Sequence, residues 1–467
     1  MERTNVWTKY TEAELQELNC INELYKACLD AGKTERECVK IAVQMAKDKG
    51  YKDLNDFIKS GTPLKAGDKV YAINMGKAIL LFNIGKKPLE EGMNLLGAHI
   101  DSPRIDVKQN PLYETDELAY LDTHYYGGIK KWQWVSQPLA LHGVFVKKDG
   151  TVVEVNIGEK EEDPVFVITD ILIHLSGSQM QKKSSEIFDG EKFDLLVGSR
   201  PIDKVDGVDD NVKDAVKANV LKLIKDAYDV EEEDFLSAEL EIVPAGKARD
   251  CGFDRSLILG YGHDDRVCSF TSLFAMLDVE DVERTAGCIL VDKEEIGCVG
   301  ATGMDSRFFE NTIAEMILLT TGAESHLKAR RALQNSAMLS SDVSAAYDPF
   351  FPECFEKKNT ALVGHGIVFN KYTGKGGKGG SNDANAEYVA KLRKVMEDAD
   401  VLYQFGELGA VDVGGGGTIA FLMARYGMNV IDSGVPVLCM HAPYELASKA
   451  DVYGAYKGYK AFLKQMW

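Results

Sequence analysis

The chain of 467 residues is long enough for two or three domains, and its 45% hydrophobic and 27% charged content is typical of globular proteins. Its 73 acidic residues exceed the 54 basic ones and give a formal net charge of −19, which argues against nucleic acid or an anionic membrane surface as the main partner. No apolar run approaches the ~20 residues of a membrane helix, and the N-terminus lacks the apolar core of a secretion signal. We therefore expect a cytoplasmic protein.

The cysteines support the same expectation. Nine of them are scattered along the chain, and no two form a Cys-x-x-Cys motif. This spacing is typical of reduced thiols and argues against a thiolate zinc site. Any histidine-based site must be drawn from eight histidines.

Residues 11–50 predict two packing helices, because their apolar residues recur with helical spacing. Gly32 is expected to end the first helix. Thr34 and Glu37 have the spacing of a capping box for the second, which extends to about Lys49.

A hairpin at Val70–Ile84 and a central strand at Asn94–Ala98 follow. His99 and Asp101 come next, at a spacing of two, which places both side chains on one face of an extended chain. An acid beside a histidine can accept its second ring proton and direct the other nitrogen toward a metal. A lone His-x-Asp is more often part of a surface turn.

From Arg104 to Phe235 strand-like segments dominate, and we interpret this region as a β-rich domain inserted into an α/β parent. Its predicted elements are strands at His142–Lys147, Thr151–Ile157 and Val165–Leu175 and a helix at about Asn211–Tyr228. Aromatic residues such as Tyr125, Trp132 and Trp134 more often belong to a core or an interface than take part in catalysis. An aromatic surface on such an insert would favour oligomer contacts.

The α/β pattern resumes at the alternating strand Ser237–Pro244. Asp264 and Asp265 then stand between a short apolar run and a helix at Val267–Leu277. Aspartates at this position are favoured helix caps. A carboxylate that bridges two metal ions needs the same placement.

Two adjacent glutamates, Glu294 and Glu295, follow the buried strand Ala286–Leu290 within the stretch Val291–Gly303. In open α/β sheets ligands bind outside the carboxyl ends of strands, and adjacent carboxylates repel each other unless cations or a shared proton hold them. A solvated turn is the ordinary interpretation of a lone Glu-Glu pair. A metal ligand beside a proton acceptor is the alternative.

The remaining strands are predicted at Met316–Thr320, Met338–Asp342 and Val430–Met440. His441 follows the last of them directly. Gly374–Gly380 is a loop without the features of a P-loop. The glycine run within Val411–Ala424 is expected to open a helix. Its backbone N–H groups could bind an anion, or the run could be a tight turn needed for packing.

Five potential metal ligands therefore follow different apolar runs: His99, Asp264, Glu295, Asp342 and His441. Two histidines and three carboxylates suit two divalent ions ~3.5–4 Å apart, bridged by a carboxylate and a hydroxide. Glu294 remains to take a proton from the bridging water. A three-histidine zinc set of His99, His174 and His441 is the alternative, and it leaves three carboxylates without a role.

Several motifs resemble the M18 family of metallo-aminopeptidases, which includes aspartyl aminopeptidase and yeast vacuolar aminopeptidase I. They are GAHIDSPRID, GHDDRVCSF, DKEEIGCVGATG, SSDVSAAYDP and CMHAPYELASKAD, together with Tyr126–Ile129 and Ile171–Leu175 in the insert. The resemblance spans nearly the whole chain. It is more specific than a likeness to M42 or M20 peptidases, which lack the two insert motifs.

The resemblance implies a role for each candidate residue. The metal ligands would be Asp264 bridging both ions, His99 and Asp342 completing one site, and Glu295 and His441 completing the other. Glu294 would be the general base, and Asp101 would orient His99. His174 would reach a neighbouring subunit's active site and contact the substrate.

The implied fold is a three-layer α/β zinc-peptidase-like domain (residues 1–103 and 236–467) with an inserted β-rich dimerisation domain (104–235). The implied activity is hydrolysis of the N-terminal peptide bond of peptides by two divalent ions per subunit, with zinc expected before manganese or cobalt. Family assemblies are dimer-based tetrahedral dodecamers. A catalytically silent shell or cargo protein on the same fold is the rival hypothesis, and the complete ligand set with Glu294 argues against it.

Two departures from the aspartyl aminopeptidases bear on specificity. Asp265 stands where those enzymes commonly carry asparagine, and the segment after Asn370 is KYTGKGGKGGSNDAN. That segment helps to shape the first substrate pocket in relatives. A preference for acidic N-terminal residues is therefore not carried over to this chain.

Overall fold

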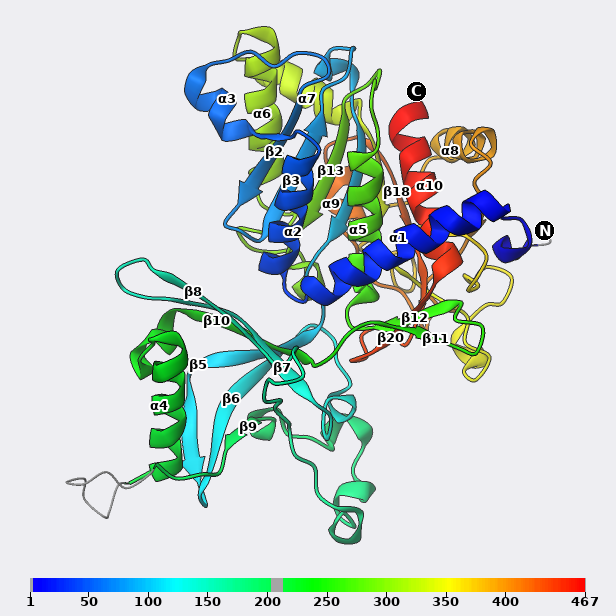
Figure 1. The fold of residues 1–467 in the computed structure, drawn as a ribbon. Coiled ribbons are helices and arrows are strands. Elements are labelled where there is room, and N and C mark those ends of the chain that lie inside the picture. The colour runs from blue at the N-terminus through cyan, green and yellow to red at the C-terminus, as the bar shows by residue number, and fades with distance from the viewer. Residues whose placement is uncertain (1–2, 203–212, 467) are drawn as a thin grey trace. The chain divides into compact units, whose positions relative to one another are not determined.

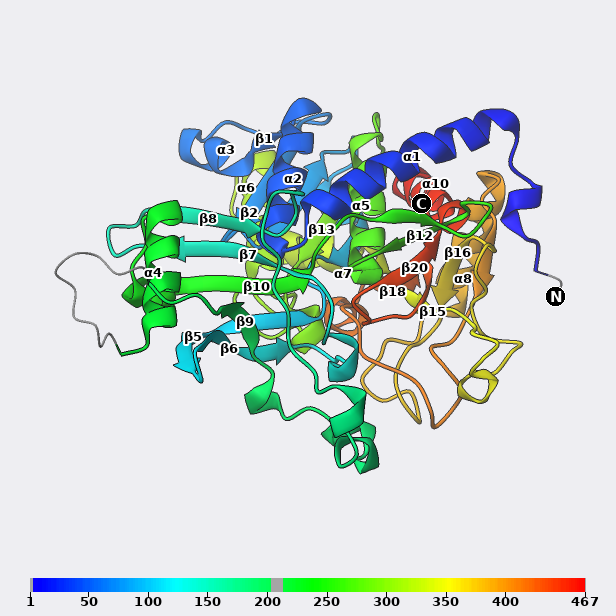
Figure 2. The same cartoon turned by 60° about the horizontal axis from the view of Figure 1, so that its bottom comes forward.

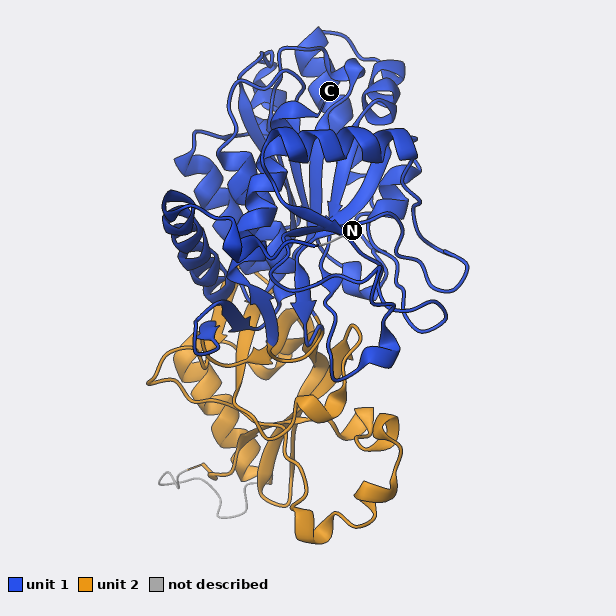
Figure 3. Cartoon of the chain, turned by 90° about the vertical axis from the view of Figure 1, so that its right-hand side faces the viewer, with its two compact units in different colours: residues 1–102, 248–440, 445–467 blue, residues 103–247, 441–444 orange. Residues whose placement is uncertain are grey.

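The computed structural model describes residues 3–202 and 213–466. The chain forms two compact units, coloured separately in Figure 3. The first comprises Met1–Ser102, Ala248–Met440 and Glu445–Trp467, and the second comprises Pro103–Lys247 and His441–Tyr444. The second unit is thus inserted, in sequence, into the first.

The first unit is built on a nine-stranded sheet whose central strands, β13, β4, β14 and β18, run parallel. In spatial order the strands are β1 (Lys52–Asp53), β2 (Lys69–Asn74), β3 (Ala78–Asn83), β13 (Ala286–Val291), β4 (Asn94–His99), β14 (Ala337–Ser341), β18 (Asn429–Gly434), β16 (Ile367–Asn370) and β17 (Tyr403–Phe405). Every residue of β4, β13 and β14 is buried, as expected for strands covered on both faces. The predicted hairpin and central strand are confirmed.

Helices cover both faces of this sheet, so the unit has three layers (Figure 1). Leu96 and Ala98 of β4 join a core with α1 (Glu12–Ala31), α2 (Glu35–Asp48), α5 (His263–Leu277), α8 (Ala386–Asp398) and α10 (Lys449–Gln465). Leu95 joins the opposite core with α3 (Leu54–Ser60), α6 (Phe308–Thr321), α7 (His326–Gln334) and α9 (Ala420–Ala424). This division follows from the two-residue period of a strand. Among the described residues, no helix is long and apolar enough to cross a membrane.

The N-terminal helices have the predicted ends. Gly32 is the C-cap of α1, and Thr34 with Glu37 forms a capping box at the start of α2. The predicted strand Met316–Thr320 is wrong, because this segment lies inside α6. Ile313, Met316 and Ile317 are buried with helical spacing, which a five-residue window is too short to reveal.

A five-stranded sheet also belongs to the first unit. Its strands are β11 (Arg249–Cys251), β12 (Leu257–Gly260), β20 (Glu445–Ser448), β19 (Pro436–Leu438) and β15 (Ser344–Ala345). The predicted single strand Val430–Met440 is therefore two strands, β18 and β19, in different sheets. The break falls at Gly434, where the Asp342 carbonyl leaves no room for a side chain, and at Pro436, which lacks an N–H donor.

The second unit contains a six-stranded sheet, and Figure 2 shows several of its strands side by side. The strand order is β8 (Val152–Ile157), β7 (Leu139–Val146), β10 (Ala238–Pro244), β5 (Arg104–Thr115), β6 (Leu118–Tyr126) and β9 (Leu195–Gly198). The expectation that the parent domain resumes at residue 236 is wrong. Strand β10 pairs with β7 along its whole length and with β5, so the insert continues to Lys247.

Two further predictions in the insert need correction. Val165–Leu175 is not a strand: it makes single bridges at Phe166 and Val167 and ends in a 3₁₀ turn at Ile173–Leu175. Helix α4 spans Ala215–Tyr228. The predicted helix start at Asn211 lies outside the described residues.

Candidate active site

The candidate ligands of the first unit gather at the carboxyl edge of its large sheet. His99 is the last residue of β4, Glu294 and Glu295 lie in the 3₁₀ turn Glu294–Ile296 after β13, and Asp342 follows β14. These three parallel strands are neighbours, so their ends meet at one place. Asp264 reaches the same place from the first turn of α5.

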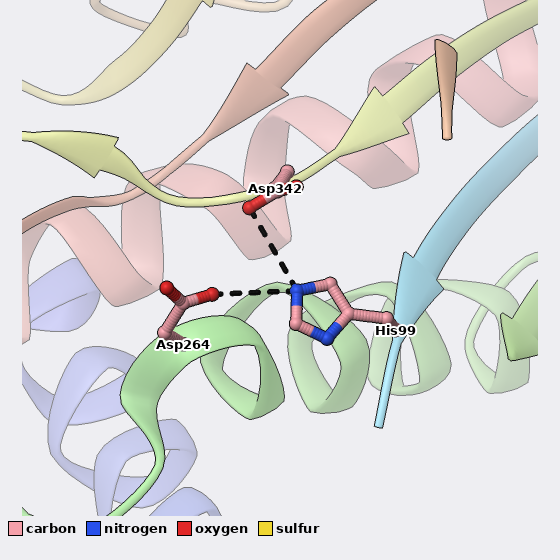
Figure 4. Close-up of side chains that lie close together, drawn as sticks. All are labelled: His99, Asp264 and Asp342. Carbon is pink, nitrogen blue, oxygen red and sulfur yellow. Dashed lines mark ion pairs between the residues drawn. The ribbon is translucent and has the colours of Figure 1, made fainter. Parts of the chain in front are cut away.

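The distances place these side chains within reach of a shared cation. His99 Nε2 lies 3.3 Å from Asp264 Oδ1, 3.8 Å from Glu294 Oε2 and 3.9 Å from Asp342 Oδ1 (Figure 4 draws the first and last of these pairs). Ligand atoms of His99, Asp264 and Asp342 all lie within 4.8 Å of one another, and so do those of His99, Glu294 and Glu295.

Asp101 connects two of these elements. Its backbone carbonyl and its Oδ1 lie 3.0 and 3.3 Å from Nδ1 of His99. Its Oδ1 also accepts the amide of Glu294, and its Oδ2 accepts the amide of Glu295, each at 3.2 Å. One buried carboxylate thus contacts the histidine and holds the turn that carries both glutamates.

The backbone around Asp264 is held from both sides. Its amide donates to Glu445 Oε2 at 3.0 Å, and its carbonyl accepts the Ser102 hydroxyl at 2.5 Å. Asp265 Oδ2 accepts the amide of His99 at 3.3 Å. The sequence assigns no role to Ser102 or Glu445, and it indicates Asp265 only as a possible helix cap and as a departure from relatives.

The electrostatics of the cluster fit a divalent cation. Burial and the charge of Asp265 raise the pKa of Asp342 well above its usual value. Burial lowers the pKa of His99, but hydrogen bonds with Asp101 and Asp264 outweigh this effect, so that pKa rises well above its usual value. Buried carboxylates this close repel each other, and a divalent cation would offset the repulsion. Imidazole and carboxylate donors suit Zn²⁺, Mn²⁺ and Co²⁺.

His441 and His174 both lie in the second unit. His441 Nδ1 is 2.8 Å from the carbonyl oxygen of Gly128, in the same unit. His174 is exposed in the turn Ile173–Leu175. Their roles as metal ligand and substrate contact stay predictions.

The two glycine-rich segments pack against each other. Gly416 donates its amide to the Thr373 carbonyl at 3.0 Å, and a side chain at Gly415 would meet the backbone of Lys375. Helix α9 after the second glycine run has only five residues. This geometry favours a packing turn over an anion site.

Comparison with known proteins identifies the family. A family model described as aminopeptidase I zinc metalloprotease (M18) matches residues 28–463. A protein from Clostridium acetobutylicum described as "Probable M18 family aminopeptidase 1" is 55% identical over 462 residues, covering 99% of this chain and 98% of that protein. The chain belongs to the M18 family.

Solved structures support the same assignment. The crystal structure of an M18 aminopeptidase from Thermotoga maritima has a TM-score of 0.94 and 42% identity, and that of aminopeptidase I from Clostridium acetobutylicum has 0.92 and 54%, each covering 100% of both chains. A structure described as the yeast mApe1 dodecamer shares the fold at 20% identity, with a TM-score of 0.78 over 96% of this chain and 97% of that one.

The resemblance to the M18 family and the expected α/β class are thereby confirmed. The chain is a metal-dependent aminopeptidase, a hydrolase of a family described as zinc metalloproteases. This finding favours the enzyme over the silent shell protein.

Proposed function

We propose that this M18 aminopeptidase uses two divalent ions per subunit, held by His99, Asp264, Glu295, Asp342 and His441. The clustering of His99, Asp264 and Asp342 at one strand edge supports one ion, and the group of His99, Glu294 and Glu295 extends the site toward a second. Asp264 is the bridging ligand in this proposal, because one carboxylate can offer an oxygen to each ion. Zinc is the expected metal.

The single observation that carries the proposed mechanism is the placement of Glu294. Its Oε2 lies 3.8 Å from His99 Nε2, and its backbone is held by Asp101. When bound, the ions polarise the substrate carbonyl and lower the pKa of water. Glu294 accepts a proton from the attacking water and delivers it to the leaving amine. Asp101 holds His99 and the backbone of Glu294 in a fixed position relative to each other during this transfer.

We further propose that the active enzyme is a homo-oligomer, built from dimers through the inserted unit and extending to a tetrahedral dodecamer. The segment around His174 exposes four large apolar side chains, Ile171, Leu172, Ile173 and Leu175. Burying them against a second copy would remove apolar surface from water. His174 in their midst would then reach the partner's substrate.

A panel of aminoacyl-p-nitroanilides, assayed with and without a chelator, tests this function. The proposal predicts hydrolysis that the chelator abolishes and zinc restores, with two ions per chain by elemental analysis. One ion per chain at full activity would contradict the dinuclear site. Metal-free or absent hydrolysis across the panel would contradict the proposal as a whole.

A further inference from the structure

A buried histidine that the proposed mechanism does not use lies directly before the bridging aspartate. His263 is the first residue of α5, and both it and Tyr25 of α1 have no exposed surface. Figures 1 and 2 show α1 lying along the same side of the sheet as α5. The Tyr25 hydroxyl lies 2.6 Å from Nδ1 of His263.

The hydrogen-bond roles in this contact follow from the second ring nitrogen. Nε2 of His263 lies 3.1 Å from the carbonyl oxygen of Ile258, and a carbonyl only accepts. Nε2 therefore carries a proton, Nδ1 of the neutral ring is an acceptor, and the Tyr25 hydroxyl donates to it.

The short segment between α1 and α2 also contacts α5. The guanidinium of Arg266 donates to the carbonyl of Lys33, in that segment, at 2.6 Å. Its Cζ lies 4.9 Å from the ring centroid of Tyr261. The first turn of α5 is thus fixed on one side by α1 and by the segment that follows it.

We propose that Tyr25 is a positioning residue for the metal centre: through His263 it fixes the backbone from which Asp264 reaches the ions. This inference rests on the proposed function, because it takes Asp264 to be a metal ligand. The amide and carbonyl of Asp264 are held by Glu445 and Ser102, and His263 supplies the third anchor. Without the Tyr25 hydroxyl, Nδ1 would be buried without a donor, and the imidazole would turn away from its present orientation.

Tyr51 provides a matched control. It is also buried, at 3% exposure, and its hydroxyl also donates to α5, to the Met276 carbonyl at 3.2 Å near the other end of the helix. Tyr25→Phe and Tyr51→Phe thus each remove one buried hydroxyl that contacts α5. Only the first removes one next to Asp264.

The test compares how fast a chelator removes zinc from the full-length wild type, Tyr25→Phe and Tyr51→Phe, with thermal unfolding midpoints measured in parallel. We expect Tyr25→Phe to lose zinc about 10-fold faster, the lower end of the 10- to 100-fold loss in metal affinity that follows removal of a direct partner of a metal ligand, because Tyr25 acts through His263. Tyr51→Phe should match the wild type within two-fold while losing similar stability. In a His263→Gln background, Tyr25→Phe should add less than a two-fold change.

The outcomes separate the two proposals. Equal zinc loss from Tyr25→Phe and Tyr51→Phe, with a wild type that binds zinc, would overturn the positioning role and leave the proposed function standing. A wild type that binds no zinc would overturn both. If Tyr25→Phe does not fold, His263→Gln compared with Tyr51→Phe decides the same question, and zinc retention equal to the control would refute the role.

Discussion

Asp101 provides the sharpest single test of how the site is held together, and the variant is Asp101→Asn. In the wild type, each side-chain oxygen accepts one backbone amide of the glutamate turn, and Oδ1 also lies near His99. Asparagine keeps one acceptor but places an NH₂ group against the second amide. A hydrogen bond to a charged group contributes about 1.5–3 kcal/mol.

The loss of one such bond sets the expected magnitude. If the whole cost falls on the metal site, zinc affinity should drop by about 10- to 150-fold, since 1.4 kcal/mol corresponds to a factor of ten. The turnover number of the fully loaded enzyme should fall as well, because Glu294 shares the loosened turn. Competition with a chromogenic chelator measures the affinity, and initial rates at saturating zinc measure the turnover.

Asp451 is the matched control for this experiment. It is also fully buried, and its two oxygens accept the amides of Gly364 and Gly366, each at 2.7 Å. Asp451→Asn removes the same kind of interaction in α10 and should lower stability while leaving zinc affinity unchanged. Equal zinc affinities for Asp101→Asn and the wild type, or equal losses in the two variants, would refute the reasoning.

Three further predictions concern the metals, the oligomer and pH. Asp264→Ala should bind neither ion tightly while Asp342→Ala loses mainly one, as elemental analysis would reveal; two ions per chain in Asp264→Ala would contradict the bridging role. Mixing inactive Glu294→Gln with inactive His174→Ala chains should restore part of the activity after subunit exchange, and no recovery despite proven exchange would exclude the contact in trans. Burial raises the pKa of Asp432 to about 7, so folding favours its protonated form. The contribution of Asp432 to the free energy of unfolding should therefore fall as pH rises from about 4 to 7, so the wild type should lose stability relative to Asp432→Asn over this range; identical pH profiles would contradict this.

Much of the site could be predicted because it depends on local pattern and on one topological rule. His99, Glu295 and Asp342 follow short buried runs, and the carboxyl ends of neighbouring parallel strands must meet. No knowledge of the strand order is needed to expect such residues at one edge. The sequence alone therefore indicates the candidate metal-binding cluster of the first unit.

The supporting contacts could not be predicted in the same way, because they join residues far apart in the chain. Glu445 accepts the amide of Asp264 across 181 positions, and Tyr25 contacts His263 across 238. Nothing in the residues near either partner signals these pairs. They depend on how α1, α5 and β20 pack.

The fold predictions failed where tertiary context decides between local alternatives. Strand β10 has the same alternating pattern whichever sheet it joins, so its pairing with β7 in the insert was not apparent. The apolar run Val430–Met440 gave no indication that it divides between two sheets at Gly434. Short apolar segments such as Met316–Thr320 fit either a strand or a buried helix.

In the proposed mechanism, Glu294 moves the proton in a reaction driven by metal ions that other residues hold. Its most direct test is the turnover number of Glu294→Gln, measured together with metal content and oligomeric state. We expect unchanged metal content and assembly, with a turnover number about 10²- to 10⁴-fold below the wild type. Turnover near the wild-type value in a fully loaded Glu294→Gln enzyme would contradict it.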